Sequence, residues 1–276
     1  MAHARGLKIP KLNLSCQNTY TGKTAYIIGG GPTNNDDMGG GKTRLQQMDD
    51  IQDKAVIKVL TGSSHRLLDQ KKLENDADIS VYNMPGAGSA DSIDRAHEGV
   101  QYWLASQCDP AMFEKLGNAA DICLWEPYVP EADYDGINDL VVGAGSTAPT
   151  AAVALLLAQG CTSFEFFGVD GGNFDFAPNE YAAYDMDDIL ARPDLQEELQ
   201  NNLLIRLSDG RAMTVAANFW NQASEMKNLM DASPDCKFVF HGNSLNHLLF
   251  NQGLTAEVTY DPRNERLALS SSVPKI

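Results

Sequence analysis

The sequence predicts an α/β protein with a Rossmann-like, three-layer fold around a mostly parallel central sheet. One observation is a strand–helix–strand unit within 140–170: an apolar run breaks at Gly145, continues as the small-residue helix 151–158, and returns as a second strand at 164–167. The other is a series of short apolar runs that alternates with helix-like segments. Strands that read as continuous apolar runs are typical of a parallel sheet buried on both faces.

The remaining elements follow from similar local patterns. The helix 151–158 is apolar almost all round, so it should be covered on more than one side. Strands are expected at 24–28, 54–60, 78–83, 102–106, 121–125 and 237–240, a hairpin at 204–215, and further helices at 92–100, 109–117, 193–201 and 216–231. We expect an N-terminal arm at 1–22, one Rossmann-like nucleotide-binding domain at 23–254, and a C-terminal hairpin or tail at 255–276.

Composition limits the classes of partner. The 276-residue chain has a formal net charge of −16 and no Lys/Arg-rich run, which opposes binding to nucleic acid or to an anionic membrane. A phosphate-bearing ligand would have to be held by backbone N–H groups, a helix N-terminus or a cation. The five dispersed cysteines favour a reducing compartment. No signal peptide is recognisable, and the longest apolar run is far shorter than the roughly 20 residues of a membrane span. A cytoplasmic protein is expected.

Polar or Gly-rich strand ends indicate where a ligand binds. In a parallel sheet these ends converge on one edge, beyond the carboxyl ends of the strands. Glycine in a strand-end turn lets backbone N–H groups approach a phosphate, although a turn without a ligand gives the same pattern. The candidate binding residues at this edge are Gly29, Gly30, Gly31, Pro32, Thr33, Asn83, Gly145, Ser146, Thr147, Gly168, Asn243 and Ser244.

Other motifs leave alternatives open. The run 39–43 resembles the end of a phosphate-binding P-loop motif. The motif also needs Gly at position 36, where this chain has Asp36, so we interpret the segment as a loop or lid. The pattern beginning at Gly143 fits a dinucleotide fingerprint in the middle of the chain, which keeps an NAD-dependent oxidoreductase as a third hypothesis. Asp170 is the candidate metal ligand, with Asp175 and Asp185 as further oxygen ligands for Mg²⁺.

The strand and turn 26–33, the turn at 145–147 and the Gly-Val-Asp at 168–170 resemble a known superfamily. It joins the archaeal 6-hydroxymethylpterin diphosphokinase-like proteins, the motility accessory factors that glycosylate flagellin (the domain of unknown function 115), and the family-42 bacterial sialyltransferases. A late strand ending in Asn-Ser is matched by Asn243 and Ser244, and the hairpin and helix 204–224 resemble the diphosphokinase-like branch. The resemblance covers roughly residues 24 to 250.

The resemblance implies a nucleotide site and a transferase activity. Gly30, Gly31 and Thr33 match the turn that approaches the phosphate, whereas Asn83 and Thr147 match nucleotide contacts. Gly168 matches a further nucleotide contact, and Asp170 matches an acid that serves the loop or a cation. The implied ligand is a nucleotide or nucleotide-sugar, CMP-linked or ATP, with or without Mg²⁺. The sialyltransferases carry a His general base in the region that corresponds to 188–211, and this chain has none there. A non-catalytic nucleotide- or partner-binding protein of the same fold is therefore the alternative, and the catalytic residues stay unknown.

Overall fold

A computed structural model describes residues 18–70, 72–73, 77–86, 88–117, 121–128, 141–143, 145–171, 201–210 and 212–262. The chain forms two compact units. We call Met1–Val169 with Glu225–Gly242 the sheet unit, and Asp170–Ser224 with Asn243–Ile276 the small unit. The division into 1–22, 23–254 and 255–276 that the sequence suggests stays a prediction.

The sheet unit contains an 8-stranded sheet with the order β10-β7-β1-β2-β3-β4-β5-β6, and its neighbouring strands are parallel. This confirms the predicted α/β, Rossmann-like architecture. The strands are β1 (Thr24–Ile28), β2 (Val56–Thr61), β3 (Ile79–Tyr82), β4 (Gln101–Ala105), β5 (Asp121–Pro127), β6 (Val141–Val142), β7 (Ser163–Phe167) and β10 (Lys237–Phe240).

Helices cover the sheet on both faces. The chain moves from β1 across to β6 in one direction and returns through α5 (Ala148–Ala158) to β7. Because parallel crossovers are right-handed, this reversal places α5 on the face opposite the connections between β1 and β5. Those connections contain η2 (Pro32–Asn35), α2 (Arg44–Asp49), η3 (Gly62–His65), α3 (Arg66–Asp69), η4 (Ser89–Ser92) and α4 (Pro110–Leu116).

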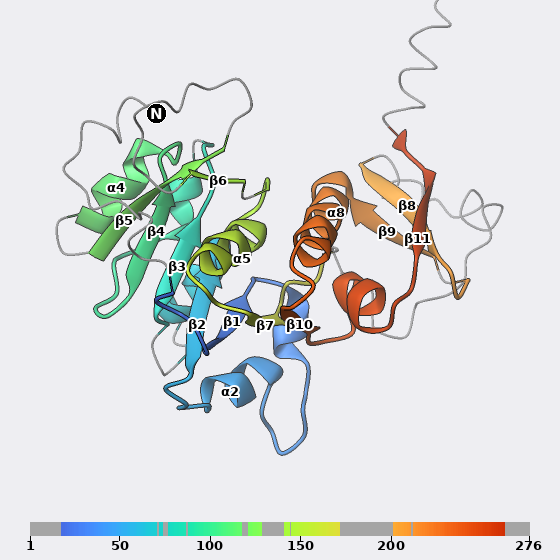
Figure 1. The fold of residues 1–276 in the computed structure, drawn as a ribbon, viewed down its shortest axis with the longest axis horizontal. Coiled ribbons are helices and arrows are strands. Elements are labelled where there is room, and N and C mark those ends of the chain that lie inside the picture. The colour runs from blue at the N-terminus through green and yellow to red at the C-terminus, as the bar shows by residue number, and fades with distance from the viewer. Residues whose placement is uncertain are drawn as a thin grey trace, which may run out of the picture. The chain divides into compact units, whose positions relative to one another are not determined.

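Helix α5 covers the central strands of the sheet. It packs against β1, β2 and β3, and lies across the sheet in Figure 1. Its residues from Thr150 to Leu156 are all buried, so every side of the helix is covered, as its apolar composition predicts. The helix begins after Thr147, whose backbone N–H donates to Thr150 Oγ1 at 3.3 Å.

Two local expectations were wrong or incomplete. The helix predicted at 92–100 is absent: after η4, Ile93 is extended. Tertiary hydrogen bonds use the backbone groups that a helix would need, because Lys115 Nζ donates to the carbonyl of Ile93 at 3.2 Å and the His97 N–H donates to Tyr102 Oη at 2.9 Å. Helix α2 was missed, although Thr43 and Gln46 carry its capping-box signal.

The small unit has a 3-stranded antiparallel sheet with the order β11-β8-β9. Its elements are β8 (Asn202–Leu207), β9 (Ala212–Ala216), the π-helical turn η6 (His247–Asn251) and β11 (Ala256–Tyr260). The predicted hairpin is thus confirmed. The buried core of the small unit includes Leu203, Ile205, Val215 and Leu248. Helix α8 (Ala217–Asp231) starts in this unit and continues into the sheet unit at Glu225. Residues 193–200 of the expected helix 193–201, and residues 263–276 of the expected C-terminal hairpin or tail, lie outside the described residues.

Within the described part of the chain, no helix is both long and apolar enough to span a membrane.

Candidate functional site

The candidate site lies where the direction of the sheet topology reverses. Strand β1 has β2 on one side and β7 on the other, so the chain leaves β1 toward one edge of the sheet and later returns to its opposite side. Such a switch point is where open parallel sheets bind ligands, beyond the carboxyl ends of the strands. The run 29–33 follows β1 and Gly168 follows β7, so the topology places both at this edge.

The backbone after β1 is packed tightly against the end of β7. The N–H of Gly29 donates to the Phe167 carbonyl and that of Gly31 to the Gly168 carbonyl, both at 2.8 Å. A Cβ on Gly29 would lie 2.4 Å from the Gly168 oxygen, so no larger residue fits there. Gly29 and Gly168 therefore serve the junction between the strands. Gly30 is exposed and leaves the outer surface of this turn open.

The end of β2 supports the same turn from the other side. Thr61 Oγ1 and Ser64 Oγ both donate to the Ile28 carbonyl, at 3.0 and 2.8 Å. Pro32 is exposed, whereas Thr33 is buried against Gly242, on which a Cβ would lie 2.6 Å from Thr33 Cβ. These contacts hold the turn from both sides.

Asn83 connects β3 with two neighbouring segments. Its side-chain amide donates to the Gly145 carbonyl at 3.1 Å, and its Oδ1 accepts from Gln107 Nε2 at 2.9 Å. Gln107 follows β4, and Gly145 precedes α5. The buried Asn83 thus fixes the loop before α5 relative to the carboxyl ends of β3 and β4.

A carboxylate occupies the loop before α5. Glu225 Oε2 accepts hydrogen bonds from the backbone N–H of Ser146 at 2.8 Å and from its Oγ at 3.0 Å. Gly145 has a φ of +68°, and a Cβ there would lie 2.7 Å from Glu225 Oε2. Glycine is thus required both by its backbone conformation and by the approach of Glu225. Thr147 Oγ1 lies 3.0 Å from Thr150 Oγ1, which keeps it at the helix cap.

The other predicted site residues belong to the small unit. Asp170 and Ser244 are buried; the Asp170 carbonyl accepts from the Asn246 N–H at 3.3 Å, and Ser244 Oγ accepts from the His247 N–H at 3.2 Å. Asn243 precedes Ser244. Among the described residues, Asp170 is not part of a cluster that could hold a metal ion. Asp175 and Asp185 lie outside the described residues, so the metal role of Asp170 stays a prediction.

Gln107 and Glu225 were not predicted from the sequence. Gln107 follows a predicted strand, and a polar residue at that position is a signal that could have been used. Glu225 lies in a helix, 79 residues from the Ser146 that it contacts. No local pattern reports a contact at that separation.

Comparison with known proteins gives a relationship in fold. No protein-family model matches the chain, and no curated protein matches it. Among solved structures, the chain is similar to the Maf glycosyltransferase of Magnetospirillum magneticum AMB-1, with a TM-score of 0.56 and 16% sequence identity. The similarity covers 95% of this chain but only 38% of that protein. The two chains therefore share a fold, and this chain spans well under half of the other protein's length.

Proposed function

We propose that the protein is a nucleotide-binding transferase that moves a glycosyl or diphosphoryl group from an activated nucleotide, either CMP-linked or ATP, with or without Mg²⁺. The observation that carries the proposal is the hydrogen-bonded turn after β1, which lies at the switch point of a parallel sheet and exposes Gly30. The fold shared with a glycosyltransferase supports the glycosyl branch of the proposal.

The negative charge of the chain limits which groups could bind a phosphate. At a net charge of −16, a phosphate needs local donors rather than a basic surface. The exposed turn at Gly30 and the loop at Ser146, which precedes α5, are proposed to face the phosphates. Asn83 acts as a positioning residue, because it holds the carbonyl of Gly145.

Glu225 is proposed as the general base in place of the His found in the sialyltransferases. A carboxylate can accept a proton from an acceptor hydroxyl, and the contact with Ser146 places this one beside the proposed phosphate position. Replacement by Gln keeps the size of the side chain and removes the basic group. Glu225→Gln is therefore expected to bind the nucleotide more tightly and to abolish transfer.

The decisive experiment is a thermal-shift screen against CMP, UDP, ATP, GTP and NAD, each with and without Mg²⁺. A ligand at about 100 times its Kd adds roughly 2.7 kcal/mol to the free energy of unfolding, which raises the Tm of a chain of this size by several degrees. A response to CMP indicates sugar transfer, and a Mg²⁺-dependent response to ATP indicates diphosphoryl transfer.

Two matched variants test whether the nucleotide that raises the Tm binds at the turn after β1. Gly30→Ala places a methyl group on the exposed turn, 3.3 Å from Ser63 Oγ, whereas Gly86→Ala meets nothing within 4 Å. The shift should shrink in Gly30→Ala and persist in Gly86→Ala. Equal shifts in both variants would remove the turn from the site. A response to NAD alone would support an oxidoreductase, and silence from all ligands would support a partner-binding protein.

A further inference from the structure

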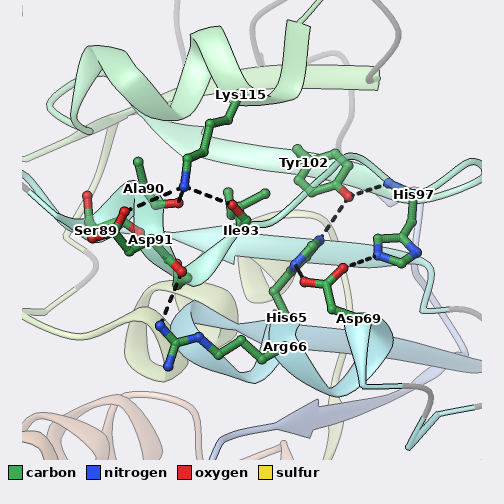
Figure 2. A network of polar contacts seen from close by, with 11 residues as sticks. His65, Arg66, Asp69, Ser89, Ala90, Asp91, Ile93, His97, Tyr102 and Lys115 are labelled. Carbon is green, nitrogen blue, oxygen red and sulfur yellow. Dashed lines mark hydrogen bonds and ion pairs between the residues drawn. The ribbon is translucent and has the colours of Figure 1, made fainter.

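A second group of polar side chains lies at the short helical segment that follows β2. The proposed transferase site does not use these residues. His65 ends η3, Asp69 ends α3, and His97 lies in the loop before β4. The spacing of four residues between His65 and Asp69 brings them onto one face of the helical turn. Figure 2 shows the carboxylate of Asp69 between the two imidazole rings.

The carboxylate faces both histidines with different oxygens. Asp69 Oδ1 lies 2.8 Å from His97 Nε2, and Oδ2 lies 3.4 Å from His65 Nδ1. The second distance is beyond the usual length of an N–H···O bond. Both His65 Nδ1 and Asp69 Oδ2 are buried without a hydrogen-bond partner. The His65 side chain is 0% exposed, so a fully buried ring directs an unpartnered nitrogen at an unpartnered carboxylate oxygen.

The outer nitrogen of His65 is held in place. His65 Nε2 lies 3.0 Å from Tyr102 Oη, and the same oxygen accepts the backbone N–H of His97 at 2.9 Å. A metal-binding histidine characteristically has its second nitrogen hydrogen-bonded in this way, which fixes the orientation of the ring. Tyr102 therefore supplies the outer partner that keeps Nδ1 directed at Asp69.

We propose that His65, Asp69 and His97 form a binding site for a first-row divalent transition ion of the Zn²⁺ type. One candidate ligand atom from each residue lies within 4.8 Å of the others. Ligands of a tetrahedral zinc lie about 3.3 Å apart, given Zn–N and Zn–O bonds of roughly 2.0–2.2 Å, so only small side-chain movements are needed. Two imidazoles and one carboxylate favour Zn²⁺ over Mg²⁺, which prefers oxygen ligands and keeps its waters.

The site has a route to solvent. The side chains of His97 and Asp69 are 13% and 9% exposed, so an ion can enter from their side and keep a water as its fourth ligand. A bound ion would cross-link the helix after β2 to the loop before β4. It would therefore stabilise this part of the sheet unit whether or not the proposed transferase activity is correct.

The test is metal binding by the intact, metal-stripped protein without an affinity tag. Zn²⁺ is titrated in competition with a chromophoric chelator, and Co²⁺ is used as a spectroscopic probe of the unmutated protein. We expect one tight Zn²⁺ site, visible d–d bands with Co²⁺ that Zn²⁺ abolishes, and a Tm increase of about 5 °C or more at 100 times Kd. Mg²⁺ should produce none of these changes.

Variants assign the site to these residues. His97→Gln and Asp69→Asn should each weaken Zn²⁺ binding by more than the roughly 10–100-fold that the loss of an outer partner costs. His241→Gln is the matched control: His241 Nε2 also lies 2.8 Å from a carboxylate, that of Glu165, but forms no three-residue cluster among the described residues. The proposal fails if the unmutated protein binds no Zn²⁺ and gives no Co²⁺ bands, or if His97→Gln and Asp69→Asn bind as tightly as His241→Gln. In either case Asp69 only bridges two histidines.

Discussion

The carboxylate of Glu225 accepts both the backbone N–H and the hydroxyl of Ser146, at 2.8 and 3.0 Å. This contact places a negative charge beside the N-terminal end of α5, where the helix dipole is positive. It also occupies the two donors that we propose for a bound phosphate. Glu225 and an anionic ligand should therefore compete for the same hydrogen bonds.

Glu225→Gln should tighten the binding of the nucleotide that responds in the screen. Removing one negative charge close to a phosphate in a solvent-exposed setting should improve the free energy of binding by about 1 kcal/mol. The Kd should therefore fall roughly fivefold. Isothermal titration calorimetry measures the change. The exposed Glu257→Gln on β11 alters the net charge equally and should leave the Kd unchanged. Unchanged or weaker binding in Glu225→Gln would show that the phosphate does not bind at Ser146.

Asn83→Ala should reduce both stability and nucleotide affinity. The variant removes both hydrogen bonds of the buried Asn83 side chain, each worth about 0.5–1.5 kcal/mol, so the free energy of unfolding should fall by about 1–3 kcal/mol. Urea denaturation measures this cost, and calorimetry measures the affinity. Gln107→Ala removes only the second of the two contacts and should have the smaller effect on binding. If the free energy of unfolding of Asn83→Ala lies within about 0.5 kcal/mol of the wild-type value, the Asn83 amide does not hold the loop before α5.

Gly29→Ala and Gly30→Ala should differ sharply in stability although they are neighbours. The added methyl at Gly29 would meet the Gly168 carbonyl at 2.4 Å, so overpacking should cost about 1–3 kcal/mol or more. At Gly30 the nearest atom is Ser63 Oγ at 3.3 Å, and the change should stay within about 0.5 kcal/mol. Chemical denaturation of both variants compares them directly. Similar stabilities would contradict the tight junction between β1 and β7.

Asp49→Ala should destabilise the sheet unit strongly. Lys58 Nζ lies 3.0 Å from Asp49 Oδ1 and donates to the Asp49 carbonyl at 2.9 Å, and both side chains are buried. Removal of the carboxylate leaves a buried ammonium group, at a cost of about 3–5 kcal/mol. The double variant Lys58→Met with Asp49→Leu should recover much of this loss, as urea melts would show. A small effect of Asp49→Ala alone would mean that Lys58 reaches solvent when its partner is lost.

Local sequence patterns were sufficient for most elements of the fold. Apolar runs located the strands of the sheet unit, and the Asp-Pro pair located α4, where Asp109 Oδ1 accepts from the Ala111 N–H at 2.9 Å. Patterns of this kind work because strand burial and helix capping depend on residues that are close in the chain. They failed at 92–100, where Lys115 and Tyr102 take the backbone groups that a helix needs.

The sequence by itself determined the parallel α/β architecture and the glycine turn after β1, because burial on both sheet faces and strand-end turns leave local signals. Only the tertiary structure decided which polar groups meet. Glu225 reaches Ser146 across 79 residues, and His97 reaches Asp69 across 28. Such contacts depend on how strands order themselves in the sheet and how helices pack on it. That order follows from the summed packing of the whole chain rather than from any single stretch of residues.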